Sequence, residues 1–190
     1  MTTKIEGTAR ERLLAAANEL FYAEGVQTVG IDRVIARAGV AKASLYNTFG
    51  SKDALVRAYL EGRAAVRQGR VEEVIARESD PRKAILGIFD VVEEIVRQKS
   101  FHGCAFVNAC ADGASDDVRE ISRTSRAWTR DAFTTLADRF GARDPEAMGR
   151  RLALLYTTAI VSAAMDRDPR AVDDARAMAE MLLDTTKRKR

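Results

Sequence analysis

The stretch from Val29 to Phe49 constrains the fold of this chain most, because two short apolar stripes flank a turn of small residues there. The stripes recur at helical spacing on either side of Ala38-Gly39-Val40, at Ile31, Val34, Ile35, Leu45 and Phe49. Neither predicted helix is long enough to be stable alone, so both must pack on a third helix. Two short helices that meet across a glycine-containing turn are typical of a helix-turn-helix. The stretch therefore predicts a three-helix unit whose second short helix, beginning near Ala41, exposes its outer face.

The outer face of that second helix has the composition of a surface that binds DNA. It contains no Asp or Glu between Ala41 and Thr48. Lys42 can reach a guanine edge or a phosphate, and hydroxyl and amide groups can bond base edges or the DNA backbone. Lys52 follows beside a helix N-terminus, and both attract phosphate. We predict DNA contacts at Lys42, Ala43, Ser44, Tyr46, Asn47, Thr48 and Lys52.

Composition alone does not argue for nucleic acid. The 190 residues carry a net charge of +3, so the DNA prediction depends on the local pattern. Taken singly, each predicted contact residue also fits the solvated surface of a small helical bundle, and only their joint spacing favours DNA. No apolar stretch approaches the ~20 residues that a membrane span needs. The first twelve residues lack the apolar core of a signal peptide, so we expect a cytoplasmic protein without membrane contact.

The rest of the chain is predicted to be helical as well. Each of the three prolines stands where a helical pattern restarts. Thr8 and Glu11 have the spacing of a capping box, Gly25 is expected to supply a left-handed stop, and Ser51 is expected to cap a long helix. We therefore predict an all-α chain of about nine helices: Thr8 to Gly25, Gly30 to Ala38, Ala41 to Asn47, Ser51 to about Arg77, one from Pro81, Cys104 to Ala111, one ending at Gly141, Pro145 to about Met165, and Pro169 to about Thr186.

Several short elements of the predicted helix-turn-helix stand in a familiar register, namely Ala38-Gly39-Val40, Leu45-Tyr46, Phe49 and Ser51-Lys52-Asp53. With them, residues 31–55 resemble the DNA-binding domain of the tetracycline-repressor (TetR) family. The resemblance implies phosphate contacts at Tyr46 and Lys52 and DNA-facing positions at Lys42, Ala43, Ser44 and Asn47. The chain departs from the family pattern at Val29, Ala41 and Thr48, where Thr, Ser and His are common. Thr28 can supply the hydroxyl that Val29 lacks, and Arg33 completes the candidate contacts.

The resemblance also divides the chain into two domains. Residues 1–50 are expected to form the DNA-binding domain, and residues 51–190 a helical domain for ligand binding and dimerisation, linked by the helix that starts at Ser51. The last two predicted helices can pair antiparallel, and two such pairs would form a four-helix bundle between subunits. Alternatively, their apolar faces pack only within one subunit. The predicted dimer contacts are Leu152, Leu155, Ile160, Met178 and Leu182.

A ligand pocket is expected among the helices of the second domain. Apolar side chains on helices are usually core, so each candidate is as well explained by packing as by ligand contact. Asn108 stands among apolar neighbours and needs a hydrogen-bond partner, which the backbone or a ligand can provide. The candidate ligand-binding residues are Phe89, Val92, Phe101, Phe106, Asn108, Trp128, Phe133 and Tyr156.

The two cysteines offer an alternative function, sensing of thiol-reactive compounds. Cys104 and Cys110 are six residues apart, which on one helix separates their Cα atoms by about 9 Å. An intact helix therefore excludes a disulfide between them, which needs less than about 7 Å. Cys104 remains a candidate reactive thiolate if His102 or a helix N-terminus lowers its pKa. An inert buried cysteine is the plainer interpretation.

Enzymatic activity is not expected, because the chain has no phosphate-binding glycine loop, CxxC pair or HExxH motif. No metal or cofactor is expected either. A protein-interaction bundle is a further alternative, from which salt-dependent DNA binding would distinguish the chain.

The resemblance implies a ligand-responsive transcriptional regulator. In its simplest form this is a homodimeric repressor that binds a partly palindromic operator and is released by a small apolar or aromatic molecule, although the sequence does not separate repressor from activator.

Overall fold

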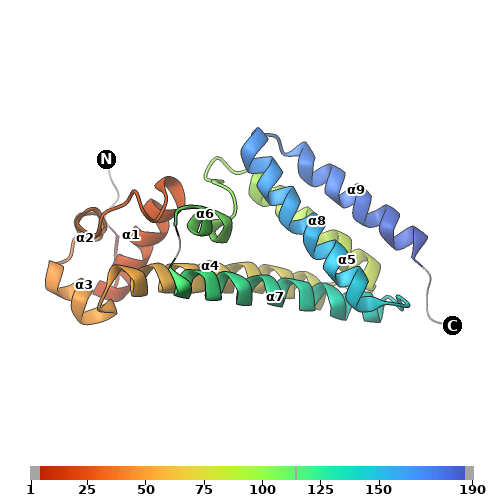
Figure 1. Ribbon diagram of the computed structural model, residues 1–190, viewed down its shortest axis with the longest axis horizontal. Helices are drawn as coiled ribbons and strands as arrows, with labels where there is room; N and C mark the ends of the chain where they lie inside the picture. The colour runs from red at the N-terminus through yellow and green to blue at the C-terminus, as the bar shows by residue number, and fades with distance from the viewer. Residues whose placement is uncertain (1–4, 114, 187–190) are drawn as a thin grey trace. The chain divides into compact units, whose positions relative to one another are not determined.

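The computed structural model describes residues 5–113 and 115–186, and within them nine α-helices succeed one another (Figure 1). The predicted all-α fold is confirmed, and the predicted helix ends agree with the observed ones within about two residues. The basic tail at residues 187–190 lies outside the described residues. The helices are α1 (Ala9–Glu24), α2 (Ile31–Ala38), α3 (Lys42–Phe49), α4 (Lys52–Arg77), α5 (Pro81–Val96), α6 (Ala105–Ala111), α7 (Asp116–Arg139), α8 (Pro145–Asp166) and α9 (Arg170–Thr185).

Local caps define where the helices begin and end. The predicted capping box is present at α1, where the Thr8 hydroxyl accepts from the Glu11 amide and the Glu11 carboxylate accepts from the Thr8 amide. The Ser51 hydroxyl accepts from the Ala54 amide at 3.1 Å and caps α4 as expected. Gly39 ends α2 in the left-handed conformation, with φ 63°. None of the described helices is long and apolar enough to cross a membrane.

By its internal contacts the chain divides into two compact units, which are described separately. The first, here the reading unit, comprises residues 1–64 and 105–122, and the second, here the core unit, comprises residues 65–104 and 123–190. Helix α4 contributes to both units, as does α7. A functional boundary at residue 50 is therefore not a boundary of packing, and the division into a DNA-binding and a sensing domain remains a proposal.

In the reading unit, α1 packs against both short helices (Figure 1). Leu13, Val34 and Leu45, one from each helix, are fully buried and form its centre. Arg12 donates from Nη1 to the Gly39 carbonyl at 3.0 Å and so holds the turn between α2 and α3 to α1. These contacts supply the third helix that the two short ones need.

The loop between α1 and α2 is held by a residue far along the chain. The Asp112 carboxylate, just after α6, accepts from the Val26 amide at 3.0 Å. Gly25 has φ 92°, and a Cβ there would lie 2.6 Å from Asp112 Oδ2. Glycine is thus required at residue 25 for its backbone conformation and for the close approach of the carboxylate. The helix ends at Glu24 as predicted, although Gly25 takes an extended ψ of 150° instead of a left-handed one.

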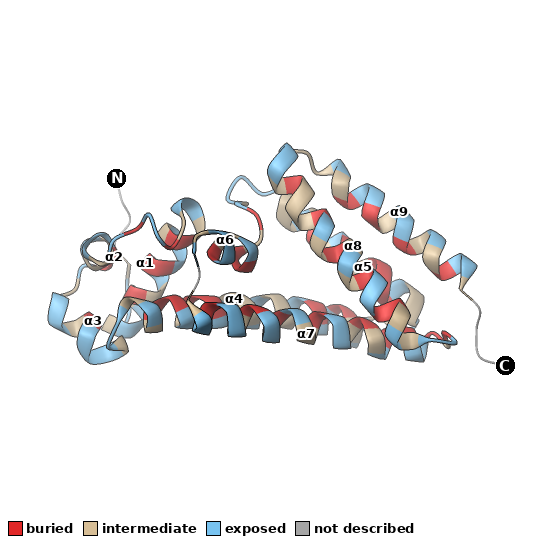
Figure 2. Ribbon diagram, viewed as in Figure 1, coloured by how far each residue is buried: buried red, intermediate tan, exposed pale blue. Residues whose placement is uncertain are grey.

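In the core unit, α5, α8 and α9 pack against one another, and their buried faces appear in Figure 2. The core also includes residues of α4 and α7, among them Val74 and Phe133. Gly149 of α8 approaches α7 closely, because a Cβ there would lie 2.8 Å from the backbone N and Cα of Thr134. The glycine therefore sets how near these two helices can pack.

Candidate DNA interface and effector site

Helix α3 has one buried side and one open side. Leu45 is fully buried and anchors the helix to the unit, while Ser44 is half-buried. The side chains of Lys42, Ala43, Tyr46, Asn47 and Thr48 are exposed, and no acidic residue lies in the helix. Ala41 is the N-cap residue, one position from the expected start. The predicted contact residues of α3 are thus accessible apart from the half-buried Ser44, and α3 itself contributes no acidic residue to this surface.

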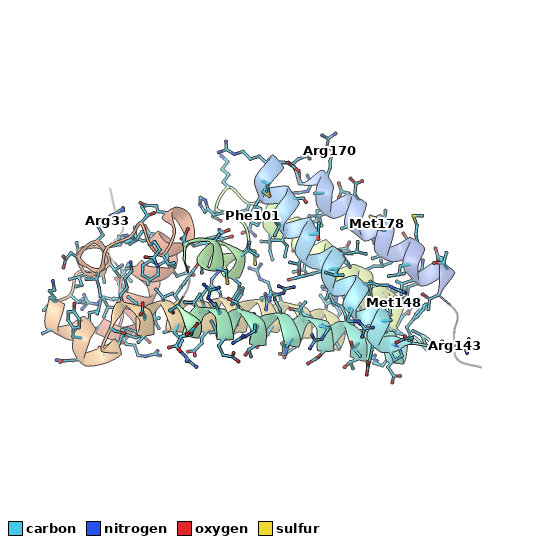
Figure 3. All side chains as sticks on the ribbon, in the orientation of Figure 1. Arg33, Phe101, Arg143, Met148, Arg170 and Met178 are labelled. Carbon is cyan, nitrogen blue, oxygen red and sulfur yellow. The ribbon has the colours of Figure 1, made fainter. Side chains whose placement is uncertain are left out.

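Two predicted cationic contacts are already held by carboxylates. Lys42 Nζ lies 3.0 Å from Asp32 Oδ1, and this hydrogen bond raises the pKa of Lys42. Arg33, labelled in Figure 3, donates through both terminal nitrogens to Glu24, at 2.7 and 2.9 Å. This pairing raises the pKa of Arg33 and lowers the pKa of Glu24, and it ties α2 to the end of α1. A DNA contact by Arg33 remains a prediction, and it would require both hydrogen bonds to Glu24 to break.

The other predicted contacts differ in their exposure and in whether their polar groups are already bonded within the chain. Tyr46 is 46% exposed, the most open aromatic residue on α3. Lys52 begins α4 and makes no ion pair within residues 5–113 and 115–186, so its charge can meet a phosphate directly. Thr48 donates its hydroxyl to the Ser44 carbonyl at 2.6 Å, so its predicted hydrogen bond to phosphate would have to replace this one. Thr28 is exposed in the loop before α2.

An aromatic cluster occupies the centre of the core unit. Tyr156 of α8 meets Phe133 of α7 at 5.9 Å and Phe89 of α5 at 6.5 Å between ring centroids, both edge to face. All three side chains are at most 5% exposed. Phe101 and Trp128 pack against this core and are partly buried, and Val92 is buried within it. The structure thus brings together six of the eight predicted effector residues in one unit.

The remaining two, Phe106 and Asn108, belong to α6 and hence to the reading unit. Phe106 is 6% exposed, and Asn108 is half-buried. The eight predicted ligand contacts therefore do not all belong to one unit, because these two lie in the reading unit and the other six lie in the core unit. Sequence periodicity could not reveal this division, because an apolar stripe shows that a helix is buried but not which unit buries it.

Polar groups adjoin the aromatic cluster. Arg67 of α4 donates from Nη2 to the Ser125 carbonyl at 3.0 Å and to the Ser125 hydroxyl. The hydroxyl of Tyr156 makes no hydrogen bond within the described part of the chain. Burial raises the pKa of Tyr156 to about 12, against the lowering effect of Arg67. At neutral pH this hydroxyl is therefore protonated and can donate a hydrogen bond.

Comparison with known proteins relates this chain to a family of bacterial regulators. The family described as bacterial regulatory proteins, tetR family, matches residues 13–59. A crystal structure of a TetR-family transcriptional regulator from Streptomyces coelicolor superposes with a TM-score of 0.87 and 31% identity, over 93% of this chain and 94% of that one. The chain belongs to the TetR family. As a member of this family it is a DNA-binding transcriptional regulator.

Other TetR-family relatives are similar over part of their sequences. The transcriptional repressor NemR of Escherichia coli K12 is 29% identical over 123 residues, which are 63% of this chain and 62% of NemR. The activator FasR of Mycolicibacterium smegmatis is 34% identical over 88 residues, 44% of this chain and 40% of FasR. The chain thus matches less than two thirds of these relatives' length. Crystalline E. coli NemR in its reduced form shares the TetR fold, with a TM-score of 0.84 and 23% identity.

Sequence reasoning missed the partners of several functional candidates in this TetR-family chain. Asp32 lies ten residues before Lys42, on the preceding helix, and Arg67 lies 58 residues before Ser125. Neither spacing corresponds to a helical or turn pattern, so no local signal announces the contact. Within residues 5–113 and 115–186, no group of three His, Cys, Asp or Glu side chains could hold a metal ion.

Replacing Tyr156 with Phe is expected to leave stability at neutral pH nearly unchanged, because the hydroxyl has no intramolecular bond to lose. The raised pKa means that the folded state holds this proton more tightly than the unfolded state. Wild-type stability should therefore fall as pH rises from 10 toward 12, by up to about 1.4 kcal/mol per pH unit from this group. Tyr156→Phe should lack that component. Urea unfolding of both proteins at pH 7 to 12 measures it, and parallel pH profiles would contradict the account.

Proposed function

We propose that this TetR-family regulator is a repressor that binds a twofold-symmetric operator as a homodimer and releases it when a small molecule binds. The observation that carries the proposal is the exposed outer side of α3, a helix without acidic residues of its own, because an exposed second helix of a helix-turn-helix fits the major groove. Residues 1–50 supply the DNA contacts and residues 51–190 the sensor and dimer contacts in this proposal. A single short helix contacts few base pairs, so two DNA-binding domains, one from each subunit, are needed for a specific site.

The proposed dimer surface lies on α8 and α9. Of the seven large apolar side chains that are exposed in the described chain, four are on these two helices: Leu154, Met165, Met178 and Met181. Met178 is labelled on α9 in Figure 3. Concentrated exposed apolar side chains are typical of an interaction surface. Two copies of this helix pair would form a four-helix bundle.

Burial within the single chain changes which residues we propose for this surface. Leu152 is 0% exposed because it faces the core of its own chain, which corrects its expected place in the dimer contact. Leu155, Ile160 and Leu182 are partly buried and pack against the same core. The proposed surface therefore keeps Met178 from the sequence prediction and adds Leu154, Met165 and Met181.

The proposed effector binds in the core unit beside the aromatic cluster. An apolar or aromatic body would pack against the rings of Phe89, Phe133 and Tyr156, and an acceptor atom would take the hydrogen bond of the Tyr156 hydroxyl. Such a ligand can release DNA only if it binds the conformer that lacks DNA more tightly. Helix α4 runs through both units and is the proposed connection between effector and DNA.

A second candidate function, thiol sensing, is favoured by the similarity to NemR, whose crystal structure is described as a reduced form. Cys104 is half-buried directly before α6, and Cys110 is exposed with its Sγ 3.4 Å from the Ser122 hydroxyl. The sensing residue in this alternative is Cys104. Thiol sensing through Cys104 requires that N-ethylmaleimide release DNA from the wild type but not from Cys104→Ser. Equal release from both proteins would exclude this function.

Replacing the two proposed phosphate contacts tests the DNA interface. Tyr46→Phe and Lys52→Ala should each weaken binding to a duplex selected by the wild-type protein by about five- to twentyfold, and Lys52→Ala should lower the salt slope by about one. Lys83→Ala, an exposed lysine of α5 in the core unit, is the matched control. Fluorescence anisotropy at several salt concentrations measures both quantities. Unchanged affinity and slope in both variants would refute these contacts.

A further inference from the structure

The reading unit carries little net charge for a DNA-binding surface. Residues 5–64 contain eight Lys or Arg and seven Asp or Glu residues, a net charge of +1, and residues 105–113 and 115–122 contain one Arg and four Asp or Glu residues, a net charge of −3. Non-specific affinity for DNA comes almost entirely from cations that neutralise phosphates. A nearly neutral unit must therefore obtain its DNA affinity from a few well-placed cations, and the availability of each one matters.

The cations of α2 and α3 are each paired with a carboxylate. Arg33 is paired with Glu24 and Arg37 with Glu19, both at 2.7 Å, and these two bridges join α2 to α1. The third pair, Lys42 with Asp32 at 3.0 Å, differs because it joins α3 to α2 on the proposed DNA-facing side. Its two side chains are 60% and 78% exposed, so water and phosphate can reach both charges.

We propose that Asp32 is a specificity-determining residue of the DNA interface, which competes with DNA phosphates for Lys42 and thereby weakens non-specific binding. The inference rests on the proposed placement of Lys42 against DNA. Asp32 is not among the residues that the α3 face predicts, and it would act although it makes no favourable DNA contact of its own.

The competition affects the two kinds of DNA unequally. On random DNA, Lys42 gains only a phosphate contact, which must replace the Asp32 carboxylate while that carboxylate still repels the DNA backbone. On the correct sequence, base contacts by the rest of α3 accompany the exchange and position Lys42. An exposed ion pair is weak enough to open in the second case. Asp32 therefore increases the ratio of specific to non-specific affinity.

A double-mutant cycle on the full-length protein tests this inference with a random-sequence duplex as the probe. The proteins are the wild type, Asp32→Asn, Lys42→Met and the double variant. The matched control is Asp53→Asn, which removes an equal charge from the exposed first turn of α4, where no ion pair to Lys42 exists in the described structure. Dissociation constants are measured by anisotropy between about 50 and 200 mM salt, a range over which phosphate contacts change affinity strongly. Far-ultraviolet circular dichroism verifies that each variant is folded.

Asp32→Asn should bind the random duplex about three- to tenfold more tightly and increase the salt slope by about one. In the Lys42→Met background, Asp32→Asn should raise the affinity for the random duplex by less than half as much. Asp53→Asn in the wild-type background should also raise it by less than half as much. An equal gain in both Lys42 backgrounds, or an equal gain from Asp53→Asn, would overturn the inference and leave the DNA function intact. A wild type without any salt-dependent duplex binding would instead overturn the proposed DNA function, and this inference with it.

Discussion

Gly149→Ala should destabilise the protein by about 2 kcal/mol and lower its melting temperature by about 4 to 8 °C. The added Cβ would lie 2.8 Å from the backbone N and Cα of Thr134, so α7 and α8 must move apart. Backbone atoms cannot rotate away as a flexible side chain can. The penalty of overpacking therefore exceeds the gain of about 1 kcal/mol that alanine brings to a helix interior. Thermal and urea unfolding followed by circular dichroism measure the change.

Gly62→Ala provides the matched control for this prediction. Gly62 is an exposed residue inside α4, and a Cβ there meets no atom within 4 Å. The same chemical change should therefore stabilise the protein by about 1 kcal/mol, through helix propensity alone. Opposite signs at the two glycines would establish that contact between α7 and α8 determines the effect. A neutral or stabilising Gly149→Ala would contradict the close packing of these helices.

The double variant Leu154→Glu, Met178→Glu should be monomeric and should bind a selected symmetric duplex at least a hundredfold more weakly than the wild type. Both side chains are more than half exposed in one chain, at 60% and 56%, so replacing them leaves the chain's own core intact. In a dimer they would be buried, and like charges brought together across a twofold axis without water are strongly unfavourable. Loss of the dimer removes the second DNA-binding domain and the additional affinity that two linked domains provide.

Val66→Glu is the control for the dimer surface, because Val66 is 60% exposed on α4 and lies outside α8 and α9. It makes the same apolar-to-acidic change and should leave both mass and DNA affinity unchanged. Sedimentation equilibrium gives the mass, and anisotropy gives the affinity. A double variant that remains dimeric would exclude α8 and α9 as the dimer surface, whereas a monomer with full affinity would exclude the need for two DNA-binding domains.

The helices of this chain could be predicted from its sequence because their ends are encoded locally. The capping box at Thr8, the serine cap at Ser51 and the prolines that open α5 and α8 each act within one helical turn, and all are observed. The face of α3 was predictable for the same reason, since the burial of Leu45 fixes which neighbours point outward.

The contacts between distant segments could not be predicted. Leu152 and Leu154 are both leucines of α8, yet one is fully buried and the other 60% exposed. Their positions differ by about 200° around the helix, and only the neighbouring helices determine which direction is inside. The same holds for Asp32, whose charge meets Lys42 only because the turn at Gly39 brings α2 and α3 together.

The most direct test of the central claim is the symmetry of the DNA that this protein selects. Wild-type protein should enrich, from a random duplex library, a partly palindromic sequence with half-sites one helical turn or more apart. Hydroxyl-radical footprints should show two equivalent protected regions that disappear together in Lys52→Ala at moderate salt. Enrichment of a single asymmetric site, or no enrichment over random DNA, would contradict a dimeric regulator that recognises DNA through α3.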